Sequence, residues 1–206
     1  MSEPHDSAPD LAARLGQLFM KWGSDKHTHL YHEFYATLPA PKRMLEVGVF
    51  KGASLRAWRE WWPEADIVGI DNFSRGYPSG FPPLTNPCLV DGDSRTYDVS
   101  RLYDGPGPDL IIDDGSHKPR DQAATFRNLW PLLAPGGVYA IEDVVLHDRP
   151  LTAWFRDRAE DFCQEWLNDL VAAVAVVAAE GAKVVIHDYR DRSGKPDSVL
   201  LVIRKS

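Results

Sequence analysis

Short apolar runs and longer stretches with helical spacing alternate along most of this chain. Each apolar run has strand length, and the first five end at a glycine or an acidic residue. The stretches between the runs repeat apolar positions every three to four residues. The predicted strands are 44–47, 66–70, 88–90, 109–113, 138–141, 183–187 and 198–203. The predicted helices are 9–21, 54–62, 120–133 and much of 151–179. Strands that alternate with helices indicate a mostly parallel sheet covered by helices on both faces.

The last two strands follow the final helix and are joined by a polar turn at 191–196, which predicts an antiparallel hairpin at one edge. The fold class is therefore α/β, with a doubly wound, mostly parallel, seven-stranded sheet and this edge hairpin. Pro39 and Pro41 separate a polar and aromatic segment from the first strand. We divide the chain into a helical arm or lid, 1–42, and one domain, 43–206.

Composition narrows the kinds of partner that this domain can have. The chain has 206 residues and a formal net charge of −7, so non-specific binding to nucleic acid or anionic membranes is not expected. The longest apolar run, 170–179, is too short to span a bilayer and predicts a buried helix face. The first ten residues are polar and resemble no secretion signal, so we expect a cytoplasmic protein. The two cysteines match neither a disulfide framework nor a zinc site.

Acidic residues stand at the carboxyl ends of five predicted strands. They are Glu46, Asp71, Asp93, the pair Asp113 and Asp114, and the pair Glu142 and Asp143. In sheets of this type, ligands bind at the carboxyl ends of the strands, near the point where the strand order reverses. This coincidence is the first indication of a functional site.

The turn after the first strand predicts a cofactor site. Gly48 and Gly52 permit close approach of a ligand, and Glu46 and Ser54 flank them. Phe50 stands where a dinucleotide-binding turn has its central glycine, so a pyrophosphate is poorly accommodated. Asp71 could accept hydrogen bonds from two ribose hydroxyls, and Asp93 with Ser94 could hold an adenine amino group. Taken together in this order, these residues predict a site for S-adenosylmethionine.

The two acidic pairs predict a metal and a catalytic base. Strands 109–113 and 138–141 are expected to be neighbours, so Asp113, Asp114, Glu142 and Asp143 face one crevice, where carboxylates repel one another without a cation. Oxygen ligands favour Mg²⁺ or Ca²⁺, and such a metal lowers the pKa of a bound hydroxyl. His117 follows Asp114 closely enough to remove the hydroxyl proton, and His147 is the alternative base or a substrate contact. An ordinary solvated turn is the competing interpretation of 113–117.

Several motifs resemble the metal-dependent sugar O-methyltransferases of macrolide biosynthesis, of the mycinamicin type. They are LEVG through GASL at 45–55, DDGSH at 113–117, GGVY with IED at 136–143, and GSDK followed by His29, Tyr31 and Tyr35. The resemblance implies the Rossmann-like methyltransferase fold and a Mg²⁺ site formed by Asp114, Glu142 and Asp143, with His117 as base. It also implies an arm that encloses both ligands, with Lys26 and Tyr31 at the cofactor and His29 and Tyr35 at the substrate.

The expected substrate is a small carbohydrate or glycoside. The acceptor is a deoxysugar of a natural product or, as in compact members of the wider group that act on polymethylated polysaccharides, a methylated mannoside. Two other functions remain open: a nicotinamide-dependent oxidoreductase, and a non-catalytic module that binds S-adenosylmethionine. A homodimer in which the arm completes a neighbour's site is a further expectation.

Overall fold

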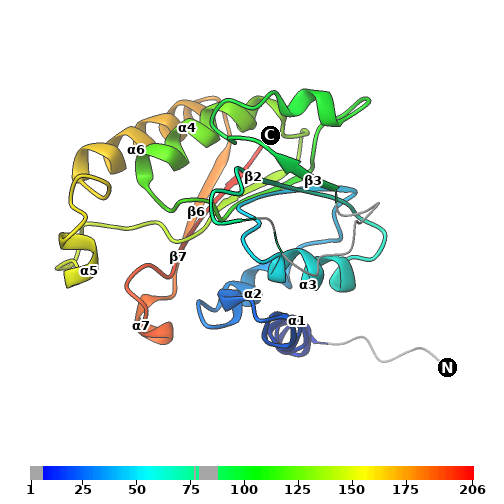
Figure 1. The fold of residues 1–206 in the computed structure, drawn as a ribbon, viewed down its shortest axis with the longest axis horizontal. Coiled ribbons are helices and arrows are strands. Elements are labelled where there is room, and N and C mark those ends of the chain that lie inside the picture. Colours follow the sequence, from blue (N-terminus) through cyan, green and yellow to red (C-terminus); the bar gives the residue numbers. More distant parts are fainter. Residues whose placement is uncertain (1–6, 77, 79–87) are drawn as a thin grey trace.

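In the computed structural model, residues 7–76, 78 and 88–206 are described, and seven strands form one sheet (Figure 1). The strands are β1 (Arg43–Val47), β2 (Asp66–Asp71), β3 (Cys88–Asp91), β4 (Leu110–Asp113), β5 (Val138–Ile141), β6 (Lys183–Asp188) and β7 (Val199–Arg204). Their order is β3-β2-β1-β4-β5-β7-β6. Neighbours from β3 to β5 pair in parallel, whereas β7 is antiparallel to both β5 and β6. The predicted sheet and edge hairpin are confirmed.

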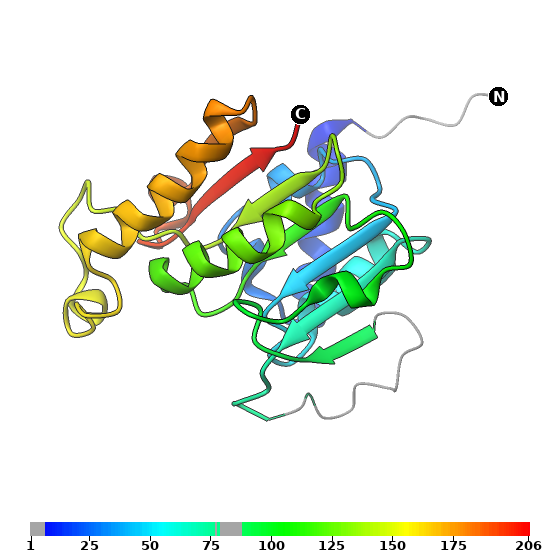
Figure 2. The same ribbon diagram turned by 90° about the horizontal axis from the view of Figure 1, so that it is seen from above.

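The helices form a layer on each face of the sheet, as Figures 1 and 2 show. They are α1 (Ala8–Trp22), α2 (Tyr31–Tyr35), α3 (Ala53–Trp61), α4 (Pro119–Leu129), α5 (Ala153–Arg156), α6 (Gln164–Ala179) and α7 (Arg190–Ser193). Short 3₁₀ turns lie at Asp25–His27, Val99–Leu102 and Trp130–Leu132. Because side chains alternate along a strand, Met44 packs toward α1–α3 while Leu45 packs toward α4 and α6.

The N-terminal arm shares the core of the domain. Ser7 and Asp10 form a capping box at the start of α1, and Gly23 ends this helix in the left-handed conformation. Leu15 and Phe19 of α1 are completely buried in the cluster that also contains Met44 of β1. The arm is thus fixed to the sheet by apolar packing.

One predicted helix is wrong in its extent. The stretch 151–179 forms two helices, α5 and α6, separated by turns. The break follows from a small apolar cluster, in which Phe155 and Phe162 are buried with Val145 after β5, so the chain must fold back between them. The stretch 74–87 is rich in glycine and proline, and part of it lies outside the described residues. Within the part of the chain that the structure describes, no helix is long and apolar enough to cross a membrane.

Candidate functional site

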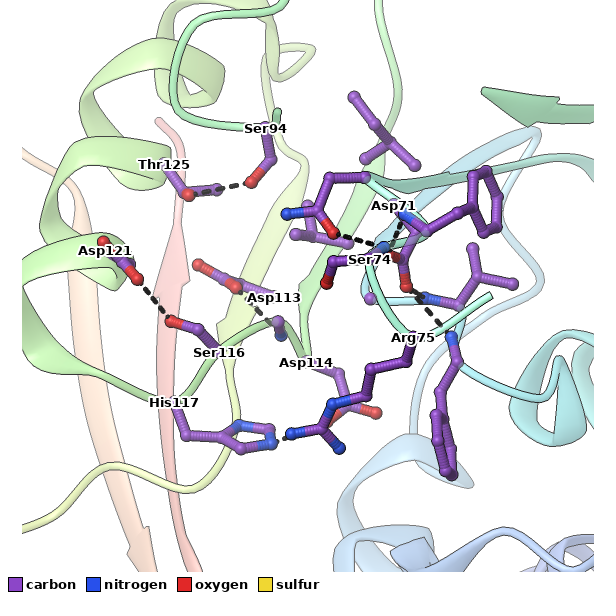
Figure 3. Close-up of a pocket in the computed structure, with 18 of the residues that line it drawn as sticks. Asp71, Ser74, Arg75, Ser94, Asp113, Asp114, Ser116, His117, Asp121 and Thr125 are labelled. Atoms are coloured by element: carbon purple, nitrogen blue, oxygen red, sulfur yellow. Dashed lines mark hydrogen bonds and ion pairs between the residues drawn. The ribbon is translucent and has the colours of Figure 1, made fainter. Parts of the chain in front are cut away.

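A cleft of about 630 Å³ lies along the carboxyl ends of the parallel strands. Its walls come from the β1–α3 turn, the ends of β2 and β3, the loop after β4 and the first turns of α4 (Figure 3). This volume lies within the range of small-molecule and cofactor sites. The position agrees with the rule for doubly wound sheets.

The β1–α3 turn forces two loops into close contact. Gly48 has a φ of +88°, and a Cβ atom there would lie 2.0 Å from the backbone oxygen of Asp114. Asp71 fixes the same turn, since its Oδ2 accepts from the amides of Val49 (2.8 Å) and Phe50 (3.0 Å). Gly52 begins α3 in the left-handed conformation. The predicted cofactor turn is therefore tightly constrained at the edge of the cleft.

The cleft contains unused hydrogen-bonding capacity at the end of β4. Asp113 is 2% exposed, its Oδ1 accepts from the Gly115 amide at 3.3 Å, and its Oδ2 has no partner among the described residues. Burial raises the pKa of this carboxyl to about 7. Asp93 pairs with Arg95 (2.6 Å), and Ser94 is 3.0 Å from the Thr125 hydroxyl. The Asp113 carboxyl is available to a ligand that donates a hydrogen bond.

A buried lysine lies among the carboxylates below the cleft. Lys26 Nζ contacts Asp114 Oδ2 at 2.5 Å, Glu142 Oε2 at 2.7 Å and Glu46 Oε1 at 3.4 Å. Burial opposes the charge of this ammonium, yet the carboxylates hold the pKa of Lys26 well above its usual value. Burial also raises the pKa of Asp114 and Glu142, and the charge of Lys26 opposes that rise. Lys26 therefore supplies part of the positive charge that the converging carboxylates require.

Aromatic and histidine side chains of the arm bind the second oxygen of Glu142 and one oxygen of Asp143. Tyr35 donates to Glu142 Oε1 and Tyr31 to Asp143 Oδ1, both at 2.6 Å. His29 Nδ1 lies 3.0 Å from Asp143 Oδ1. Burial alone would raise the pKa of Asp143, but the hydrogen bond of His29 and the nearby imidazoles lower it to about 2. Asp143 is therefore an anion in a polar surrounding.

His117 lies in the wall of the cleft above these carboxylates. Its Nδ1 is 3.6 Å from Asp143 Oδ2 and its Nε2 is 3.9 Å from Asp114 Oδ1. His117 (φ +59°) and Asp143 (φ +54°) both have left-handed backbones, which residues other than glycine adopt at a cost. Strained backbone at two facing residues is typical of a functional site, and it directs both side chains toward Asp114 (Figure 3 shows His117 and Asp114).

The donor set suits a hard divalent cation. Asp114, His117 and Asp143 each offer one ligand atom, and these atoms lie within 4.8 Å of one another. Lys26 alone does not balance the carboxylates of Glu46, Asp114, Glu142 and Asp143. Both Glu142 oxygens already bind Lys26 and Tyr35, so Asp114 and Asp143 are the more accessible ligands, and Glu142 would contribute a remaining lone pair.

The predicted site residues divide into those in the cleft wall and those behind it. The wall contains Gly48, Ser54, Asp71, Asp93, Ser94, Asp113, Asp114 and His117. The residues outside this lining are Lys26, His29, Tyr31, Tyr35, Glu46, Gly52, Glu142, Asp143 and His147.

Direct ligand contact by the arm residues stays a prediction, because the polar ends of these residues are occupied by carboxylates in this structure. Lys26, His29, Tyr31 and Tyr35 are at most 6% exposed, because their polar ends are turned inward onto the carboxylates. Glu46 is likewise buried, where Ser54 (3.0 Å) and Trp58 (3.3 Å) donate to it. These side chains belong to the buried cluster of carboxylates and their partners and are not part of the cleft lining.

Two supporting residues were not predicted from the sequence. Gln122, on the first turn of α4, donates to the backbone oxygen of Glu142 at 2.9 Å and also lines the cleft. Ser198, before β7, lies 3.0 Å from His29 Nδ1. The contact of Ser198 could not be predicted, because Ser198 and His29 are far apart along the chain. Gln122 could have been predicted, because it lies about one helical turn after the DDGSH motif.

The strand order, the glycine turn and the acidic cleft define the Rossmann-like methyltransferase fold. Residues 45–144 match the family described as a methyltransferase domain.

Curated relatives agree with this assignment. A tetracenomycin-C derivative 3'-O-methyltransferase that acts on a 2-methoxy-alpha-L-rhamnosyl compound, from Streptomyces olivaceus, is 34% identical over 63% of this chain and 36% of the relative. Mycinamicin VI 2''-O-methyltransferase from Micromonospora griseorubida is 33% identical over 50% of this chain and 27% of the relative. The chain thus spans about a third of the length of these relatives.

A solved structure shows the same fold. The MycE methyltransferase of the mycinamycin biosynthetic pathway, in complex with Mg, SAH and mycinamycin VI, superposes with a TM-score of 0.62. Sequence identity is 22%, and the match covers 93% of this chain and 54% of the other.

Proposed function

We propose that this protein transfers a methyl group from S-adenosylmethionine to a sugar hydroxyl, with the assistance of Mg²⁺. One observation carries the proposal: the cleft joins the constrained glycine turn to Asp114 and His117, so a cofactor site and a deprotonation site share one wall. The sugar O-methyltransferases among the relatives support the acceptor class.

The cofactor would lie between the β1–α3 turn and the ends of β2–β4. Gly48 lets the loop that carries Asp114 pack against the turn. Asp71 is placed to accept from ribose hydroxyls, and Ser94 lies beside Asp93 at the adenine position. Asp113 Oδ2 would receive a donor from the ligand. Bound there, S-adenosylmethionine would supply a sulfonium methyl group, and Mg²⁺ held by Asp114, Asp143 and Glu142 would lower the pKa of the acceptor hydroxyl.

His117 then acts as the general base. It accepts the proton of the acceptor hydroxyl while the new oxygen–carbon bond forms and the methyl–sulfur bond breaks, leaving a neutral thioether. Asp143 faces His117 Nδ1 and stabilises the imidazolium that results. Lys26, Tyr31 and Tyr35 hold the carboxylates in place during this step.

The acceptor is a glycoside, either a deoxysugar of a natural product or a methylated mannoside. A homodimer and a cytoplasmic location remain predictions from the sequence.

The test is a methyl-transfer screen on a panel of rhamnosides and mannosides, with release of S-adenosylhomocysteine as the readout. Turnover is expected with Mg²⁺ and not with EDTA. His117→Ala should lower kcat by about 10²–10⁴-fold without weakening S-adenosylhomocysteine binding in calorimetry. His147→Ala should retain most turnover, since His147 does not line the cleft. Full activity of His117→Ala would overturn the assigned base, and tight binding of NAD would favour an oxidoreductase.

A further inference from the structure

The cleft has a second end, formed by α5, that the cofactor site does not use. Trp154 of α5 lines the cleft together with His117 and Lys118. Figures 1 and 2 both show α5 at one end of the molecule and β3 toward the other, with the parallel strands between them. Trp154 therefore brings α5 to the part of the cleft lining that also contains His117 and Lys118.

Trp154 differs from the aromatic residues around it. Phe155 and Phe162 are 4% and 2% exposed and pack on Val145, whereas Trp154 is 52% exposed. The Trp154 ring meets Phe155 edge to face, with centroids 4.8 Å apart. A single exposed aromatic residue is ordinary on a protein surface. Trp154 is distinguished because its ring packs on two buried phenylalanines and because it lines the cleft that contains His117.

Polar groups contact the Trp154 ring and lie around it. The Arg158 guanidinium lies 4.3 Å from the centroid of the Trp154 ring, and Arg158 also donates to the Trp154 backbone oxygen at 3.1 Å. Lys118 Nζ pairs with Asp161 at 2.9 Å, which ties the turns after α5 to the loop that carries His117. The guanidinium thus covers one face of the indole, and the part of Trp154 that stays exposed is bordered by charged donors and acceptors.

We propose that Trp154 forms the acceptor subsite and packs against the apolar face of a pyranose ring. A pyranose combines a face of C–H groups with hydroxyls around its rim, and a rigid indole flanked by charged side chains complements both. The Lys118–Asp161 pair would contact rim hydroxyls while one hydroxyl faces His117. This inference rests on the proposed function and names the residue that selects its substrate class.

The test is saturation-transfer NMR on the full chain with S-adenosylhomocysteine present, using methyl α-L-rhamnopyranoside and methyl α-D-mannopyranoside as probes. The wild type should transfer saturation to the ring protons of at least one sugar. Trp154→Ala should reduce this signal about tenfold, and Trp154→Phe should keep it within about threefold. Val171→Ala removes an exposed apolar side chain of α6 that does not line the cleft, and it should leave the sugar signal intact.

Calorimetric S-adenosylhomocysteine binding by Trp154→Ala at the wild-type level would show that the variant is folded. An undiminished sugar signal in that variant, or no signal from either sugar in the wild type, would overturn the subsite. Sugar binding that depends on Trp154 without methyl transfer would support the subsite and contradict the proposed function, so the two failures are distinct.

Discussion

At the scale of single residues, the most informative side chain is Lys26. The alternation of apolar and polar residues predicted an acidic crevice that needs a cation, and the structure places this ammonium between three carboxylates. The sequence could not show this, because Lys26 is 88 residues from Asp114 and 116 from Glu142. Lysines are rarely buried completely, so composition favours an exposed position for this residue.

Replacement of Lys26 by methionine is expected to lower the free energy of unfolding by about 3–5 kcal/mol at pH 7, since it leaves buried carboxylates without their counter-ion. Urea unfolding measures this loss. Lys42→Met, on the exposed surface, is the control and should change the stability by less than about 0.5 kcal/mol. Equal stability of the two variants would show that the carboxylates are neutral without Lys26.

Glu46 gives the fold a pH dependence. Burial raises its pKa from 4.5 to about 7, against the charge of Lys26. As pH rises from about 4.5 to about 7, the unfolded chain releases this proton while the folded chain retains it, so wild-type stability falls across the window. Glu46→Gln lacks this loss, and its stability relative to the wild type should increase by up to about 3 kcal/mol between pH 5 and pH 8.

Urea unfolding at the two pH values tests the Glu46 prediction. Glu60→Gln is the control, because Glu60 is exposed and paired with Lys21. A relative stability of Glu46→Gln that does not change with pH would mean that Glu46 ionises normally in the folded protein.

At the scale of elements, the order and kind of strands and helices followed from apolar spacing. The sequence predicted the glycine turn between β1 and α3 from close approach of a ligand. In the structure, Gly48 instead makes room for the backbone of Asp114. The division between α5 and α6 was missed, because Phe155 and Phe162 fit a continuous helical pattern and only their burial against Val145 reveals the break. Periodicity gives the face of a helix, but tertiary packing decides where it ends.

Gly48→Ala is expected to weaken S-adenosylhomocysteine binding at least tenfold and to lower Tm, since the new methyl group would displace the loop that carries Asp114. Calorimetry and thermal unfolding measure the two effects. Gly136→Ala is the matched control: Gly136 also has a positive φ, of +75°, but its Cβ would meet nothing within 4 Å. Its cost should be only about 1 kcal/mol of backbone strain. If both variants behave alike, strain and not the close contact limits the turn.

At the scale of the whole molecule, the arm and the sheet form one structure. Two of the arm's residues, Tyr31 and Tyr35, are buried in the core and also bind Asp143 and Glu142. From the sequence we expected an arm near the site, with Tyr31 at the cofactor and Tyr35 at the substrate. Aromatic residues with hydroxyl groups fit either position, and only the structure shows which way they point.

A chain that begins at residue 43 should therefore fail to unfold cooperatively in urea and should not bind S-adenosylhomocysteine. The reason is the loss of Leu15, Phe19, Tyr31 and Tyr35 from the core. Near-ultraviolet circular dichroism and calorimetry test this prediction against the full chain. A truncated protein that folds and binds the cofactor product would show that the arm is a separable lid.

The left-handed backbones of His117 and Asp143 set a limit for protein engineering. Glycine at either position would relieve about 1–3 kcal/mol of conformational strain. At position 143 this gain is offset, because Tyr31 and His29 would lose their buried partner. A library selected only for heat resistance would therefore enrich glycine at position 117, and the surviving variants would have lost the imidazole of the site. Selection for a more stable catalyst must measure turnover in every round, because stability and catalysis favour different residues at position 117.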